Sequence, residues 1–271
     1  MVLGFSGWMD GGEVSTGSVA YLIQQTEARK LAEILPDDFY IYNFPGSMEF
    51  SALFRPLVDM EEGIIRKYQE PDNSFYYDET NQLILFVGKE PNLKWNVFSE
   101  SIFTLANEFH CEEIYFVGSF AGLIPHTREP RITCNVSEAS LKHRLAQFNL
   151  SFSNYHGPGG IVSCLTHTAR QRGVQMINLV AEIPAYVEGR NPRCIEAMVK
   201  YLATLLTLQV NLEEMRLIGD ELEKKLNKAI EDKPDLQEHI QKLEEIYDKE
   251  MFDADLGDLK HWLERQGIRL D

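Results

Sequence analysis

The chain is poor in cysteine and has no long apolar run. Its cysteines form no CxxC pair, and the four of them are Cys111, Cys134, Cys164 and Cys194. This spacing predicts neither a disulfide framework nor a zinc site, and it is typical of reduced, mostly buried thiols. No apolar stretch approaches the roughly 20 residues that span a bilayer, and the first residues lack the basic and apolar regions of a signal peptide. We therefore expect a cytoplasmic protein without a membrane segment.

Basic residues are also scarce. The chain has 26 Lys and Arg against 42 Asp and Glu, which gives a formal net charge of -16 at pH 7. Such a charge repels the phosphate backbone of nucleic acids, and no stretch combines basic with aromatic residues as nucleic-acid surfaces do. We expect no nucleic-acid partner.

Motifs for phosphate, metal or nucleophile chemistry are absent from the sequence. No GxGxxG or Walker A string occurs, and the histidines show no HxH or HxxxH spacing. Ser6 lies in a strand-to-helix turn, but the glycine that a nucleophile elbow requires two residues later is replaced by Trp8. We therefore expect no cofactor and no metal, and the sequence identifies no catalytic residue.

Apolar residues make up 44% of the 271 positions, which is enough for one large core with an appendage. Runs rich in branched and aromatic residues predict strands at residues 2–5, 39–44, 83–87, 114–117 and 176–180. Segments with helical spacing lie between and after them, at residues 14–35, 97–109, 136–148, 161–171 and 194–208. This alternation predicts an α/β fold, a three-layer α/β/α sandwich with a mainly parallel sheet.

The pattern changes after residue 210. Apolar residues then recur at helical spacing over 212–246, with an interruption at 231–234, where Pro234 favours the first turn of a new helix. We predict a core domain at 1–210 and a C-terminal helical hairpin with a terminal helix at 211–271. Residues 211–250 contain 13 acidic and 7 basic residues, a local charge of -6, which favours a solvated acidic face. Whether the apolar stripe packs on the core or on another subunit stays open.

Three loops carry the polar residues of a candidate site, because each follows a predicted strand and we expect them to meet at one end of the sheet. The loops are residues 7–12, 124–130 and 155–160. The candidate residues are Trp8, Asp10, Glu90, His126, Thr127, Arg128, His156, Gly157, Glu182 and Tyr186. Asp10 is expected to cap the helix that follows it, or to hold the first amides of that helix, rather than to catalyse. Trp8 is expected to seal the end of the sheet, with the wall of a ligand pocket as the alternative. His156 is either a solvent-facing residue or a proton carrier.

Arg128 has two interpretations. With His126 and the amides near Gly157, which precede a predicted helix, it would form an anion-binding corner. An arginine in a polar loop more often pairs with a carboxylate, here Glu90 or Glu182.

Several of these motifs together resemble the proteasome assembly chaperone family. The string GFSGWMDGG at 4–12 is similar to that family's GFxGWxDAG opening, and further landmarks follow in the same order over residues 2–208. They are Glu90-Pro91 with Trp95 and Phe98, Gly118 with PHTREP at 125–130, YHGPGGI at 155–161, PAYV at 184–187 and Asn191-Pro192.

The resemblance implies an α/β/α sandwich of the phosphorylase/hydrolase-like kind that assembles into homo-oligomers. Relatives act as chaperones for proteasome subunits, and some bacterial members carry an ATP-grasp or carboxylate-amine ligase label. The chain departs from the family at two points. Ala185 stands where some members have histidine, and the chain ends in RLD rather than in a hydrophobic-Tyr-X tail.

Two functions follow as alternatives. The first is a non-catalytic oligomeric scaffold that binds protein partners, with the segment 211–250 flanking the subunit interface or projecting as a binding arm. The second is an enzyme of the hydrolase, phosphorylase or carboxylate-amine ligase type, acting on a small anionic substrate around Asp10, Arg128 and Gly157. We favour the scaffold, because fold resemblance alone does not establish catalysis.

Overall fold

A computed structural model describes residues 1–148 and 150–265, with side chains described through Asp253. An eight-stranded sheet with the order β2-β5-β6-β1-β7-β10-β8-β9 forms its centre. The strands are β1 (Val2–Ser6), β2 (Arg29–Glu33), β5 (Ser74–Asp78), β6 (Leu83–Lys89), β7 (Glu113–Gly122), β8 (Ile132–Val136), β9 (Ser151–Phe152) and β10 (Gln175–Pro184). The central strands β6, β1, β7 and β10 are parallel, as predicted.

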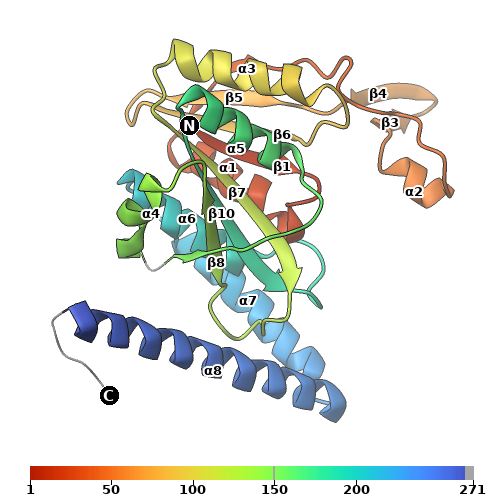
Figure 1. Ribbon diagram of the computed structural model, residues 1–271. Coiled ribbons are helices and arrows are strands. Elements are labelled where there is room, and N and C mark those ends of the chain that lie inside the picture. Colours follow the sequence, from red (N-terminus) through yellow and green to blue (C-terminus); the bar gives the residue numbers. More distant parts are fainter. Residues whose placement is uncertain (149, 266–271) are drawn as a thin grey trace.

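Helices cover both faces of this sheet, so the α/β/α sandwich is confirmed (Figure 1). One face carries α1 (Val14–Gln25), α4 (Ser140–Leu145) and α6 (Pro192–Leu206), and the other carries α3 (Trp95–Glu108) and α5 (Ile161–Arg172). Neighbouring strand residues alternate between the two layers: Val2 and Leu85 face α1 and α6, whereas Leu3 and Ile84 face α3 and α5. Continuous apolar runs therefore mark the central strands, because both of their faces are buried.

The strand predicted at 39–44 is wrong. Phe39 and Tyr40 lie in an irregular segment and are buried against the α3 layer, where the ring of Phe39 meets the ring of Phe98 edge-on at a centroid distance of 5.2 Å. The Tyr40 hydroxyl also bonds to the side chain of Asn73 at 2.8 Å. The apolar run at 39–44 thus reflects burial of a loop.

Two predicted helices are too long. The helix expected over 14–35 ends at Gln25, and the chain then reverses through Glu27, which has φ +52°, to form β2. The helix expected over 136–148 is reduced to α4 and a short 3-10 turn, because Val136 is the last residue of β8. Strands β2 and β5 run antiparallel to their neighbours, and β8 runs antiparallel to β10 but parallel to β9. The sequence did not predict these three strands.

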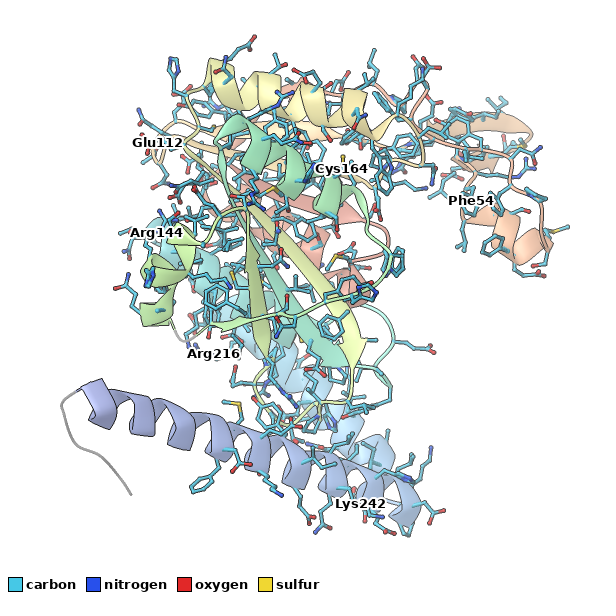
Figure 2. All side chains as sticks on the ribbon, in the orientation of Figure 1. Phe54, Glu112, Arg144, Cys164, Arg216 and Lys242 are labelled. Carbon is cyan, nitrogen blue, oxygen red and sulfur yellow. The ribbon has the colours of Figure 1, made fainter. Side chains whose placement is uncertain are left out.

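The chain segment that connects β2 to β5 projects from the core as a separate element (Figure 1). This arm, residues 44–69, consists of α2 (Met48–Ala52) and a two-stranded sheet of β3 (Leu57–Glu61) and β4 (Ile64–Gln69). Figure 2 shows the labelled Phe54 in this arm, well away from the sheet. Three rings, Phe44, Phe50 and Phe54, contact one another with centroid distances from 4.9 to 5.5 Å and form a small local cluster.

Two helices end the chain, α7 (Glu213–Ile230) and α8 (Pro234–Arg265). α7 packs on α6, where Gly219 lies against Arg193. α8 begins at Pro234, as predicted, and Figure 1 shows it turning back across the lower end of the core. Its backbone runs through the segment predicted as a terminal helix; the side chains after Asp253 and the RLD end lie outside the described residues. No helix in the described part is long and apolar enough to cross a membrane.

Candidate functional site

Glu90, the residue after β6, joins two of the three predicted loops. Its carboxylate accepts hydrogen bonds from the backbone N–H of Trp8 at 3.2 Å and from that of Ile161 at 3.1 Å. Gly7, with φ +140°, permits this approach, because a Cβ there would lie 2.9 Å from the Glu90 Cβ. Ile161 is the first residue of α5, so the Glu90 carboxylate occupies the amide end of that helix. The amides in which we expected an external anion therefore hold a carboxylate of the chain itself.

The Asp10 side chain holds the first turn of α1, as predicted, although Glu13 is the residue at the N-cap position. Its Oδ1 accepts a hydrogen bond from the backbone N–H of Thr16 at 3.0 Å, and its Oδ2 accepts one from the Thr16 hydroxyl at 2.8 Å. Loss of hydration through burial raises the pKa of Asp10 to about 6, although the hydrogen bonds from Thr16 act in the opposite direction. Asp10 is thus a structural carboxylate with a raised pKa.

His126 fixes the remaining predicted loop, 124–130, against two other elements. In the structure this third loop spans residues 123–131, between β7 and β8. Its backbone N–H donates to the Tyr186 hydroxyl at 2.8 Å, and its Nδ1 lies 2.8 Å from the same oxygen. The Nε2 lies 3.0 Å from Oδ1 of Asn227 on α7. We assign Nε2 as the protonated nitrogen, because the Tyr186 hydroxyl can then donate to Nδ1 while Nε2–H donates to Asn227. With its backbone N–H and both ring nitrogens paired and 7% of the residue exposed, His126 positions the loop.

Arg128 binds α8. Its Nε and Nη2 donate to Oδ1 and Oδ2 of Asp248, each at 2.8 Å, and its Nη1 lies 3.3 Å from Oε1 of Glu244. The Thr127 hydroxyl donates to the same Glu244 oxygen. Arg128 holds the pKa of Asp248 below its usual range. The prediction of a carboxylate partner is confirmed, but Glu90 and Glu182 are not that partner.

A second arginine extends this contact. Arg131 donates to Glu250 at 2.7 Å and stacks over the ring of Tyr247 at 5.0 Å, and its Nε lies 3.7 Å from Glu182. The Tyr247 hydroxyl donates to the backbone carbonyl of Glu129 at 2.8 Å. The loop and α8 therefore form one polar interface, in which α8 supplies the carboxylates and the loop supplies the arginines.

The expected role of Trp8 is wrong, and His156 faces solvent. Trp8 is 64% exposed, so it does not seal the sheet. His156 and Gly157 lie on the exposed side of the loop before α5. Glu90 brings this loop to the Trp8 loop, whereas the Arg128 loop is bonded to α7 and α8.

The described residues line several cavities, three of which lie near the loops or the sheet edge. A space of about 20 Å³ lies between the third loop, α6 and α7, a groove of about 760 Å³ lies between that loop, α7 and α8, and a groove of about 410 Å³ lies beside β2. None of these three is lined by Trp8, Asp10 or Gly157. In the part of the chain that the structure describes, no group of three His, Cys, Asp or Glu side chains could hold a metal ion.

The sequence did not single out the partners on α8, which are Glu244, Tyr247, Asp248 and Glu250. The one local signal is the spacing of Glu244 and Asp248 by four residues, which places both carboxylates on one helix face.

A model of the PAC2 family matches residues 4–230 of the chain. The chain belongs to the PAC2 family. The match ends at Ile230, the last residue of α7, so α8 lies beyond the matched part of this PAC2 member.

Solved structures share its fold. A proteasome-assembly chaperone homologue of Mycobacterium tuberculosis is 23% identical and has a TM-score of 0.76, with 88% of this chain and 98% of that chain covered. A PAC2 family protein of Streptomyces avermitilis is 24% identical at a TM-score of 0.75, with the same coverage. PbaB, an archaeal proteasome activator of Pyrococcus furiosus, is 19% identical at a TM-score of 0.62, with 84% of this chain and 91% of that chain covered. No curated protein matches the sequence.

Proposed function

We propose that this PAC2 family member is a non-catalytic scaffold that binds protein partners, in the manner of a chaperone. The observation that carries the proposal is the pairing of the candidate anion-binding groups with carboxylates of the chain itself. Glu90 occupies the amide end of α5, and Asp248 and Glu244 bind Arg128. An enzyme for a small anionic substrate needs these groups free for the substrate, whereas a scaffold uses them to hold its loops in place.

The proposal includes assembly and location. The protein acts in the cytoplasm as a homo-oligomer with protein partners, and it takes no cofactor, nucleic acid or membrane. Family membership supports this role, since structures similar in fold include a proteasome-assembly chaperone homologue and an archaeal proteasome activator. We further propose that residues 1–210 act as the core domain, and that residues 211–271 act as a separate partner-binding unit. The local charge of -6 over residues 211–250 supports that assignment.

One observation favours the enzyme alternative. A carboxyl group with a pKa of about 6 can exchange protons near neutral pH, and Asp10 has such a pKa. Both of its oxygens are nevertheless bonded to Thr16. The enzyme therefore ranks second.

A binding experiment distinguishes the scaffold function from the enzyme function. The tagged full chain is purified from its source cells, and each captured protein is then produced and mixed with it at equal concentrations. We expect a complex of defined stoichiometry between purified components, and no stabilisation in a thermal-shift screen of anionic metabolites. A metabolite that stabilises the wild type but not Asp10→Asn, with no protein complex reconstituted, would show that the enzyme alternative is correct.

A further inference from the structure

The arm at residues 44–69 has one face that is entirely apolar. In the register of its hairpin, Val58 pairs with Tyr68 and Met60 pairs with Ile65. Directly opposed residues point to the same face, and alternate residues of a strand do so too, so these four side chains lie together.

The opposite face of the hairpin is mixed. It carries the pairs Leu57–Gln69, Asp59–Lys67 and Glu61–Ile64. A bulge between Asp59 and Met60 creates the difference, because it leaves Arg66 without an opposed residue and brings Ile65 onto the face of Tyr68. One apolar face and one face with charged side chains are the pattern of a strand pair that is covered on one side.

Nothing in the described chain covers this face. The large apolar side chains exposed on the arm are Phe44, Met48, Phe50, Leu53, Leu57, Val58, Met60, Ile64, Ile65 and Tyr68. Val58, Met60, Ile65 and Tyr68 of this set form the apolar face, whereas Leu57 and Ile64 lie on the mixed face. The remaining four side chains extend the exposed apolar surface of the arm to α2 and the residues beside it. A two-stranded hairpin is marginally stable in water unless something packs on it.

The same chain offers a matching apolar surface. The groove of about 410 Å³ beside the edge strand β2 is lined largely by apolar side chains, among them Ile34, Leu35, Phe39, Phe75 and Leu105. The lining residues 32–39 are joined to the arm by a short stretch of chain, residues 40–43. A twofold pair would bring each arm to the groove of the other copy.

Electrostatics also favours contact between copies at this place. The chain carries a formal charge of -16, so two copies repel each other over most of their surface. Residues 44–69 carry 4 acidic and 3 basic side chains, a charge of -1. The arm is therefore nearly neutral and its contact with a second copy costs little repulsion.

We propose that the apolar face of the arm docks on the β2 groove of a second copy of this chain. This inference rests on the proposed assembly into oligomers and adds the surface that forms it. Contact through the acidic segment 211–250 would be a different interface.

The hairpin contains its own matched control. Ile65 lies on the apolar face and is 55% exposed, whereas its neighbour Ile64 lies on the mixed face and is 57% exposed. We expect Ile65→Lys to convert the wild-type oligomer to monomer in light scattering at micromolar concentration, and Ile64→Lys to leave it intact. Circular dichroism and thermal unfolding of both variants report whether the core is folded.

The groove is tested in the same way. Leu35 is 60% exposed at the groove, and Leu217 on α7 is 59% exposed outside it. Leu35→Lys is expected to raise the dissociation constant of the oligomer at least tenfold, whereas Leu217→Lys is expected to leave it unchanged. A monomeric wild type overturns this inference together with the proposed oligomer. A wild-type oligomer that survives both Ile65→Lys and Leu35→Lys overturns the docking surface alone.

Discussion

Arg128 and Asp248 lie 120 residues apart in sequence and form a two-point ion pair, with both nitrogen–oxygen distances at 2.8 Å. This geometry fixes the orientation of α8 relative to the third loop, because a planar guanidinium meets both oxygens of the carboxylate at once. Both partners are partly exposed, so the pair contributes more to orientation than to the stability of the core.

The first prediction concerns this ion pair. Asp248→Asn should weaken the docking of α8 and speed amide hydrogen exchange in residues 240–253 several-fold, with little change in core unfolding. Glu245→Gln is the matched control, because Glu245 bonds to Gln241 on the same helix. Equal exchange in the two variants would contradict the proposed role of Asp248.

The second prediction concerns the amide end of α5. Glu90→Ala should destabilise the fold by about 1 kcal/mol and leave the amide of Ile161 free for an anion. Millimolar phosphate should then raise the unfolding temperature of Glu90→Ala but not that of the wild type. If phosphate stabilises both proteins equally, Glu90 does not occupy an anion site.

A third prediction follows from the raised pKa of Asp10. The pKa of Asp10 is about 6 in the folded protein, whereas an unperturbed aspartate, which represents the unfolded chain, has a pKa of 3.8. The folded protein therefore binds this proton more tightly than the unfolded chain does. The contribution of Asp10 to the free energy of unfolding should therefore be greatest below pH 4, and should fall by about 3 kcal/mol as the pH rises from 4 through 6. Asp10→Asn removes the titration, so the wild-type and variant curves should converge toward low pH. Denaturant unfolding from pH 4 to 7 measures this, and parallel curves would contradict it.

The fourth prediction concerns two glycines, Gly4 and Gly219, whose replacement by alanine should change the stability in opposite directions. A Cβ on Gly4 would lie 2.7 Å from the Ser15 carbonyl oxygen and 2.9 Å from Val19, so Gly4→Ala should push α1 from β1 and cost about 1–3 kcal/mol. A Cβ on Gly219 in α7 would lie no closer than 3.5 Å to Arg193. Gly219→Ala should therefore stabilise the helix by about 0.5–1 kcal/mol. Chemical denaturation of both variants compares them directly, and equal effects would refute the packing argument.

Local sequence was sufficient to predict the central layers. The strands β1, β6, β7 and β10 are buried on both faces, so each is a continuous apolar run, and the helices between them show helical spacing. The cap from Asp10 to α1 was also predictable, because it joins residues only six apart. Such features depend on residues that are close together in the sequence, so they can be predicted from the sequence alone.

The tertiary structure alone decided the partners of the candidate site. Glu90 meets Ile161 across 71 residues and Arg128 meets Asp248 across 120, and nothing local distinguishes these carboxylates from the other acidic residues. The exposure of Trp8 and the burial of Phe39 also depend on what packs nearby, since apolar character alone does not place a side chain. In the arm, a single bulge determines which face is apolar. The pattern of apolar residues along the sequence therefore determined the layers of the sandwich. Long-range packing decided which charges are paired and which apolar surface is left uncovered.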